Sequence, residues 1–186
     1  MVLYILIAAA VIALAGFIWL YNLLILRWQM VNNGWADIDV QLKRRSDLIP
    51  RFVEAVSAYA SHERTLFEDI AQKRAMTEAA GEDPARRAEA EGALAKPVAR
   101  LVALAEAYPD LKASGNFSGL QKELVETENR IEMARRFYNG AVRELNTAVQ
   151  SFPSSIIARM AGFSPRTYFE IDAPERASPQ VGFAKP

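Results

Sequence analysis

The sequence predicts an all-α protein in which one N-terminal transmembrane helix is followed by a bundle of long, coiled-coil-like helices. Two observations predict this class. The first 26 residues carry no charged side chain, and later segments repeat apolar residues at alternating steps of three and four. With 186 residues, the chain can still bury a core after the membrane segment is set aside.

The segment from Met1 to Leu26 is long enough to cross a bilayer, because about 20 apolar residues span the hydrocarbon core. A cleaved signal peptide would have a basic start and a shorter apolar stretch, and neither is present. Basic side chains follow the span at Arg27 and in the run from Lys43 to Arg45. The positive-inside rule therefore predicts an anchor over residues 1–27 with its N-terminus outside and the following domain in the cytoplasm.

Three small residues of this span, Ala9, Ala13 and Gly16, share one helix face. Small residues allow two membrane helices to approach closely. We expect this face to pack against a second anchor if the chain forms a homo-oligomer.

The bundle domain is expected over residues 28–163. Its first seam predicts a single helix from Trp28 towards Gly81 that continues through Pro50. Its apolar positions are Trp28, Val31, Trp35, Ile38, Leu42, Ile49, Phe52, Val56, Tyr59, Leu66 and Ile70. Asp83 and Pro84 then provide a cap and a first helical residue for a second helix over residues 85–107.

A third, long helix is expected to begin at a cap formed by Ser118 or Asn116, and to be an antiparallel neighbour because the preceding loop is short. Its seam is Leu124, Thr127, Ile131, Ala134, Tyr138, Ala141, Leu145, Ala148 and Phe152. Pro153 ends it, and a short helix over residues 156–160 is closed by Gly162.

Residues 164–186 contain four prolines and no apolar period, so they predict an irregular C-terminal tail. Within this tail, Thr167, Tyr168 and Phe169 are candidates to dock on the bundle.

A dense cluster of charges lies between Asp37 and Asp47 on the first helix. One interpretation is a solvated face, and another is a surface that docks a protein partner. The third is structural: Arg45 interrupts the apolar seam, so it points inward and pairs with Glu126 or Glu128, while Asn129 completes the hydrogen bonds. Such a network would fix the register of the helices.

Several classes of function lack their signatures. Lys+Arg and Asp+Glu both number 22, so nucleic acid is not an expected partner. With no cysteine and one histidine, the chain lacks the ligand sets of zinc and di-iron sites. No phosphate-binding loop or nucleophile motif occurs, so we expect no enzyme, no cofactor and no small-molecule substrate. An enzyme of unrecognised type, using Glu63 or Asp39, is a further alternative.

Five stretches in order resemble the LemA family. They are YNLLILR (21–27), WADIDVQLKRRSDLIPRFVEAVSAYASHE (35–63), AEAYPDLKASGNFSGLQKEL (105–124), ETENRIEMARRFYNGAVRELN (126–146) and FPSSIIARMAGF (152–163). The resemblance implies a bacterial inner-membrane protein with one N-terminal span and an antiparallel four-helix bundle of the up-and-down type. It brings no catalytic residue. The sequence departs from the family at Ala95-Lys96-Pro97, so the second helix is expected to be kinked or to start late.

We therefore expect a non-enzymatic, single-pass membrane protein that contacts the lipid bilayer and presents its bundle as a scaffold or adaptor for protein partners. The alternative is a membrane-organising protein that acts by homo-oligomeric self-assembly.

Overall fold

The computed structural model of this protein describes residues 1–171, which form helices and no strand. The all-helical class and the long apolar N-terminal helix are confirmed. The helices are α1 (Val2–Ser57), α2 (Arg64–Ala79), α3 (Pro84–Glu106), α4 (Pro109–Lys112), α5 (Gly115–Gln150) and α6 (Ser154–Ala161).

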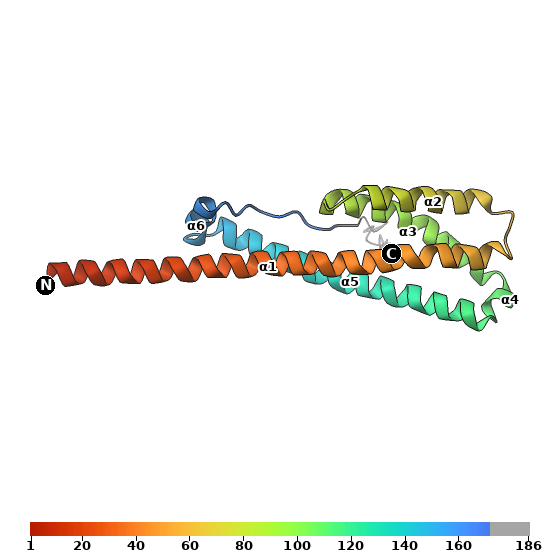
Figure 1. Cartoon of the computed structure of the whole chain (residues 1–186), viewed down its shortest axis with the longest axis horizontal. Coiled ribbons are helices and arrows are strands. Elements are labelled where there is room, and N and C mark those ends of the chain that lie inside the picture. The colour runs from red at the N-terminus through yellow and green to blue at the C-terminus, as the bar shows by residue number, and fades with distance from the viewer. Residues whose placement is uncertain (172–186) are drawn as a thin grey trace, which may run out of the picture.

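The longest helix, α1, runs along the whole molecule, and α5 returns beside it in the opposite direction (Figure 1). Helices α2 and α3 form a hairpin that lies beside the C-terminal half of α1. The short α6 follows α5 and lies where the free N-terminal part of α1 begins. An extended segment, residues 164–171, then runs back along the bundle.

No break separates the anchor from the bundle, because α1 passes through Arg27 without interruption. Burial on α1 begins at Leu24, which is fully covered by Ile157 and Ala158 of α6. The packing of the bundle therefore begins inside the segment that was expected to be only anchor.

The expectation of one helix from Trp28 towards Gly81 is wrong, because the chain reverses between Ser57 and Arg64. Ala60 lies in this turn and is fully buried. The reversal places Leu66 and Ile70 in the same core as Val56, whereas a straight helix would hold them far apart along its axis. The free energy gained by burying this apolar surface exceeds the free energy that a continuous helix would gain.

The second predicted helix corresponds to α3. Asp83 caps it by accepting a hydrogen bond from the backbone N–H of Arg86 at 2.9 Å, and Pro84 is its first residue. The helix does not start late, since it continues through Pro97 to Glu106.

Both predicted ends of the third helix need correction. α5 begins at Gly115 with Ser114 as its cap, before Asn116 and Ser118, and this allows Phe117 to be buried 4.9 Å from the ring of Phe52. It ends at Gln150, ahead of Pro153, so Phe152 lies outside the seam and is 82% exposed.

The core has three clusters along the molecule. The distal cluster, at the α2–α3 end, includes Phe52, Val56, Leu94, Leu101 and Phe117. The central cluster joins α1 to α5 and includes Ile38, Leu42, Ile131, Tyr138 and Leu145. The proximal cluster, nearest the anchor, is Leu24, Ile157 and Ala158, with Leu20 and Phe163 against it.

Helices α1 and α5 are in close contact at Gly34. A Cβ added there would lie 3.1 Å from the backbone Cα of Tyr138 and 3.1 Å from the ring of Phe137. The glycine therefore sets the distance between the two helices.

We expect Gly34→Ala to lower the free energy of unfolding by about 1 kcal/mol, because overpacking against a backbone costs about 1–3 kcal/mol and alanine recovers about 1 in helix propensity. Gly140→Ala is the matched control, since a Cβ at Gly140 on α5 would meet nothing within 4 Å. It should stabilise the protein by about 0.5–1 kcal/mol. Urea unfolding in detergent, followed by circular dichroism, measures both, and equal effects would contradict the close approach.

Candidate functional site

A buried ion cluster joins three helices at the centre of the bundle. Arg45 of α1 is 2% exposed, and its guanidinium donates to the carboxylate of Glu91 on α3. Its Nη1 donates to Oε1 of Glu128 on α5 at 3.0 Å. Arg87 of α3 donates from Nε to Glu91 Oε1 at 3.0 Å and lies 3.6 Å from Asp39 of α1. These five residues are called the ion cluster below.

The ion cluster contains both buried and partly exposed side chains. The side chains of Arg45 and Glu91 are almost fully buried, while those of Glu128 and Asp39 are about half exposed. Burial alone would lower the pKa of Arg45, but the charges of Glu128 and Glu91 and their hydrogen bonds outweigh it and raise the pKa above its ordinary value. The guanidinium therefore stays charged in the core, where only its partners make the charge tolerable.

The structure brings together only part of the residue set named from the sequence. Arg45 and Glu128 are paired, but Glu126 lies on an exposed face of α5 and pairs with Arg130 one turn away. That hydrogen bond and the charge of Arg130 lower the pKa of Glu126. Asn129 lines a pocket beside Arg45 and Glu128, with no hydrogen bond to either among the contacts of the described residues.

Glu91 and Arg87 were not predicted as partners of Arg45, although the spacing of the second helix indicates them. The apolar seam of the second helix runs through Leu94 and Val98. One heptad earlier, the same two positions are occupied by Arg87 and Glu91. Two charges of opposite sign in seam positions would have indicated partners for Arg45.

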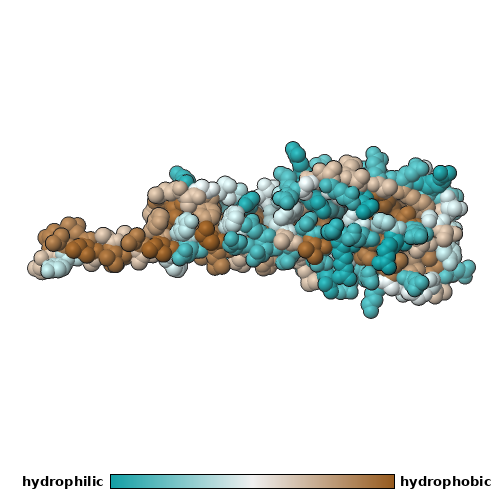
Figure 2. Space-filling view, in the orientation of Figure 1, coloured by the Kyte–Doolittle hydropathy of each residue, from teal (hydrophilic) through white to brown (hydrophobic). Residues whose placement is uncertain are grey.

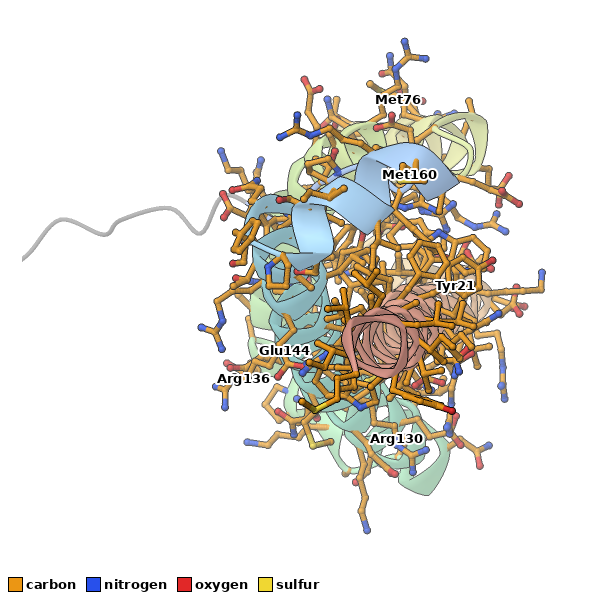
Figure 3. The ribbon with its side chains drawn as sticks, turned by 90° about the vertical axis from the view of Figure 1, so that its left-hand side faces the viewer. Tyr21, Met76, Arg130, Arg136, Glu144 and Met160 are labelled. Carbon is orange, nitrogen blue, oxygen red and sulfur yellow. The ribbon has the colours of Figure 1, made fainter. Side chains whose placement is uncertain are left out.

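The charged stretch from Asp37 to Asp47 therefore divides into an inner and an outer part. Arg45 is buried and Asp39 reaches Arg87, whereas Asp37, Lys43 and Asp47 are exposed. The exposed charges on α5 show the same outward arrangement, with Arg130 and Arg136 pointing away from the bundle (Figure 3).

A strap formed by residues 164–171 binds the groove between α1 and α5. Asn139 donates to the carbonyl of Phe169 at 3.1 Å and accepts from its N–H at 2.9 Å. Seven residues later, Asn146 holds Arg166 by the same pair of bonds, at 2.9 and 2.7 Å. The two amides thus replace the strand partner that this extended backbone lacks.

The side chain of Phe169 is fully buried, and its ring lies 5.6 Å from that of Trp35. The hydroxyl of Tyr138 donates to the carbonyl of Thr167 at 2.8 Å, and burial raises the pKa of this phenol. Thr167 and Phe169 thus dock on the bundle, while Tyr168 is exposed. The rest of the predicted tail, residues 172–186, lies outside the described residues.

The anchor is the second candidate site. One 18-residue window in α1 is long and apolar enough to cross a membrane, and none of it is buried. Ala9, Ala13 and Gly16 all lie exposed in this part of the helix, and a Cβ added at Gly16 would meet nothing within 4 Å. Figure 2 shows this segment as a continuous hydrophobic surface beside a mostly hydrophilic bundle.

Within residues 1–171, no three His, Asp or Glu side chains are grouped closely enough to hold a metal ion. His62 lies in the turn before α2, with Nε2 3.9 Å from Glu63.

The chain is similar in sequence to one protein family and to several known proteins. A model of the LemA family matches residues 34–183. The chain is 23% identical to Magnetosome protein MamQ of Magnetospirillum gryphiswaldense, over 87% of this chain and 70% of that protein. It is 24% identical to Magnetosome proteins MamQ 1 and MamQ 2 of Paramagnetospirillum magneticum, over 73% of this chain. The match spans 59% of the length of each of these two relatives, which is less than two thirds.

We expect Arg45→Met to lower the free energy of unfolding by about 3 kcal/mol, because it leaves Glu91 buried with Arg87 as its remaining cationic partner. Lys43→Met, on the exposed face of the same helix, should change it by less than about 0.5 kcal/mol.

Double-mutant cycles of Arg45→Met with the Glu→Gln variants identify the partners. The coupling free energy of Arg45 should be largest with Glu91 and smaller with the half-exposed Glu128. With Glu126 it should lie within about 0.5 kcal/mol of zero. Additive effects of Arg45 and Glu91 would contradict the ion cluster.

Proposed function

The chain belongs to the LemA family, and from this membership and the architecture above we propose that it is a non-enzymatic, single-pass membrane protein. Its helical domain acts as an antiparallel four-helix bundle that is presented at the cytoplasmic face as a scaffold or adaptor for protein partners. The membrane is the bacterial inner membrane, and the N-terminus lies outside.

The observation that carries this proposal is the continuity of α1. The same helix is exposed and apolar in its first part and contributes one buried face to the bundle core from Leu24 to Val56. The 30 residues from Trp28 to Ser57 extend about 45 Å at the rise of an α-helix. A bundle built on such a helix is held in a fixed direction relative to the proposed anchor.

The charge distribution supports the proposed orientation. Arg27 directly follows the span and forms an ion pair with Glu144 of α5, which ties the anchor end to the bundle. The further cations on α1 also lie on the bundle side of the span. This distribution favours a cytoplasmic bundle.

The bundle offers a surface on which partners can dock. Val125 and Met133 of α5 are large apolar side chains that are more than half exposed. Exposed apolar side chains on a rigid helix are the type of contact that adaptors use, because their burial on binding is favourable.

Self-assembly is a second candidate function, and the exposed small-residue face of the span favours it. Ala9, Ala13 and Gly16 would let two anchors pack closely within the bilayer. The likeness to relatives named magnetosome proteins also supports a role in organising a cellular structure.

Two arginines in the span should prevent insertion. Leu6→Arg together with Ile12→Arg should move the chain from carbonate-washed membranes to the supernatant, because each charge costs about 2.5–3.5 kcal/mol at the bilayer centre. Val40→Arg is the matched control, since Val40 is exposed on the same helix beyond the span, and it should stay in the membrane. A double variant that is retained like the control would contradict the anchor.

Photo-crosslinking in cells separates the two functions. A photoreactive residue at Val125 or Met133 should yield adducts with other proteins, in larger amounts than at Arg136, an exposed charged position on the same helix. Adducts of this chain with itself alone would favour self-assembly. Adducts no stronger than those at Arg136 would contradict the adaptor surface on α5.

A further inference from the structure

The short helix α6 lies at the level where the apolar span ends. Its inner face, Ile157 and Ala158, packs on Leu24 of α1. The ring of Phe163, just after α6, lies 6.3 Å from that of Tyr21 at an edge-to-face angle. The first charged side chain of α1 is Arg27, only three residues beyond Leu24. The proximal cluster therefore joins α6 to the last turns of the span.

This level corresponds to the surface of the bilayer. About 20 residues cross the hydrocarbon core, which places Tyr21 and the residues after it among the headgroups. Aromatic side chains prefer this depth, and Trp19 and Tyr21 provide them on α1. Because α6 packs against the same turns, its outer side faces the region that the headgroups occupy.

The outer face of α6 is apolar and open. Ile156 and Met160 lie one turn apart on α6 and are 52% and 73% exposed, and Phe152, two residues before the helix, is 82% exposed. In Figure 3, which shows the molecule from the N-terminal end of α1, α6 stands in front of the other bundle helices and carries Met160. Arg159 is exposed beside them and adds a cation. Such a combination of apolar and basic residues is typical of helices that lie in the plane of a membrane surface.

We infer that α6 is an interfacial helix: Phe152, Ile156 and Met160 insert at the boundary between headgroups and acyl chains of the bilayer that holds the anchor, and Arg159 faces lipid phosphate. This inference rests on the proposed insertion of the anchor. It gives the bundle a second attachment to the same membrane, beside α1. The bilayer is favoured over a protein partner as the occupant because α6 packs on the last turns of the span, so its open face lies beside the hydrophobic end of the molecule (Figure 2).

The chain has no cysteine, so single cysteines can carry nitroxide labels without background. We would place the full-length protein in vesicles of phosphatidylethanolamine and phosphatidylglycerol, and measure collisions of the label with oxygen and with a water-soluble nickel chelate. Met160→Cys reports on α6, and Phe152→Cys reports on the apolar side chain just before α6 if the first variant folds poorly. Met133→Cys is the matched control, an exposed methionine on α5. Ile12→Cys reports on insertion of the anchor itself.

The label at Met160 should resemble that at Ile12, with high oxygen and several-fold lower nickel accessibility than at Met133. Nickel access at Met160 equal to that at Met133, with Ile12 protected, would overturn the inference and leave the anchor intact. Nickel access at Ile12 would overturn both the anchor and the inference. Protection of Met160 from oxygen as well as nickel would show that protein, such as a second copy of the chain, covers α6, which also overturns the inference.

Discussion

The packing of α1 against α5 determines where the other elements lie. The two helices touch along most of α5, and Gly34 brings their backbones close enough for Tyr138, Ile38 and Leu42 to form the central cluster. At one end of this pair, α6 closes on Leu24, and in the middle the strap fills the groove with Phe169. These smaller elements bury few residues of their own, so they depend on the pair for their position.

The α2–α3 hairpin is joined to that pair in two ways. The distal cluster buries apolar surface between the hairpin and the pair. The ion cluster fixes the position of α3 along α1 and α5, because Arg45 pairs with both Glu91 on α3 and Glu128 on α5. Apolar packing tolerates small shifts of one helix along another, but a buried guanidinium does not. A displacement of α3 by one turn would separate Glu91 from Arg45 and Arg87 from Asp39, so the ion cluster selects one register among several that the apolar seams would permit.

Features governed by local periodicity or local chemistry could be predicted from the sequence, and features governed by distant contacts could not. The apolar span, the seam of α5 and the cap at Asp83 each depend on residues close together in the chain. The reversal before α2 depends on Ala60 entering a core built by α3 and α4, and the early start of α5 depends on Phe117 meeting Phe52. In the candidate site, the inward position of Arg45 followed from its place in a seam. Its main partner, Glu91, lies 46 residues away, and only its place in the seam of the second helix indicated it. The amide pairs that hold the strap have no pattern in the sequence.

With the anchor inserted as proposed, the unbroken α1 helix would also make the position of the bundle depend on the thickness of the membrane. Membrane helices tilt by about 20° on average, and they adjust this tilt when the hydrocarbon layer becomes thinner or thicker. Over the roughly 45 Å that α1 extends past the span, a 20° change would swing its far tip sideways by about 15 Å. A hinge at Arg27 would absorb such a rotation, but α1 is continuous there, so the proposed insertion would make the bundle rotate together with the span.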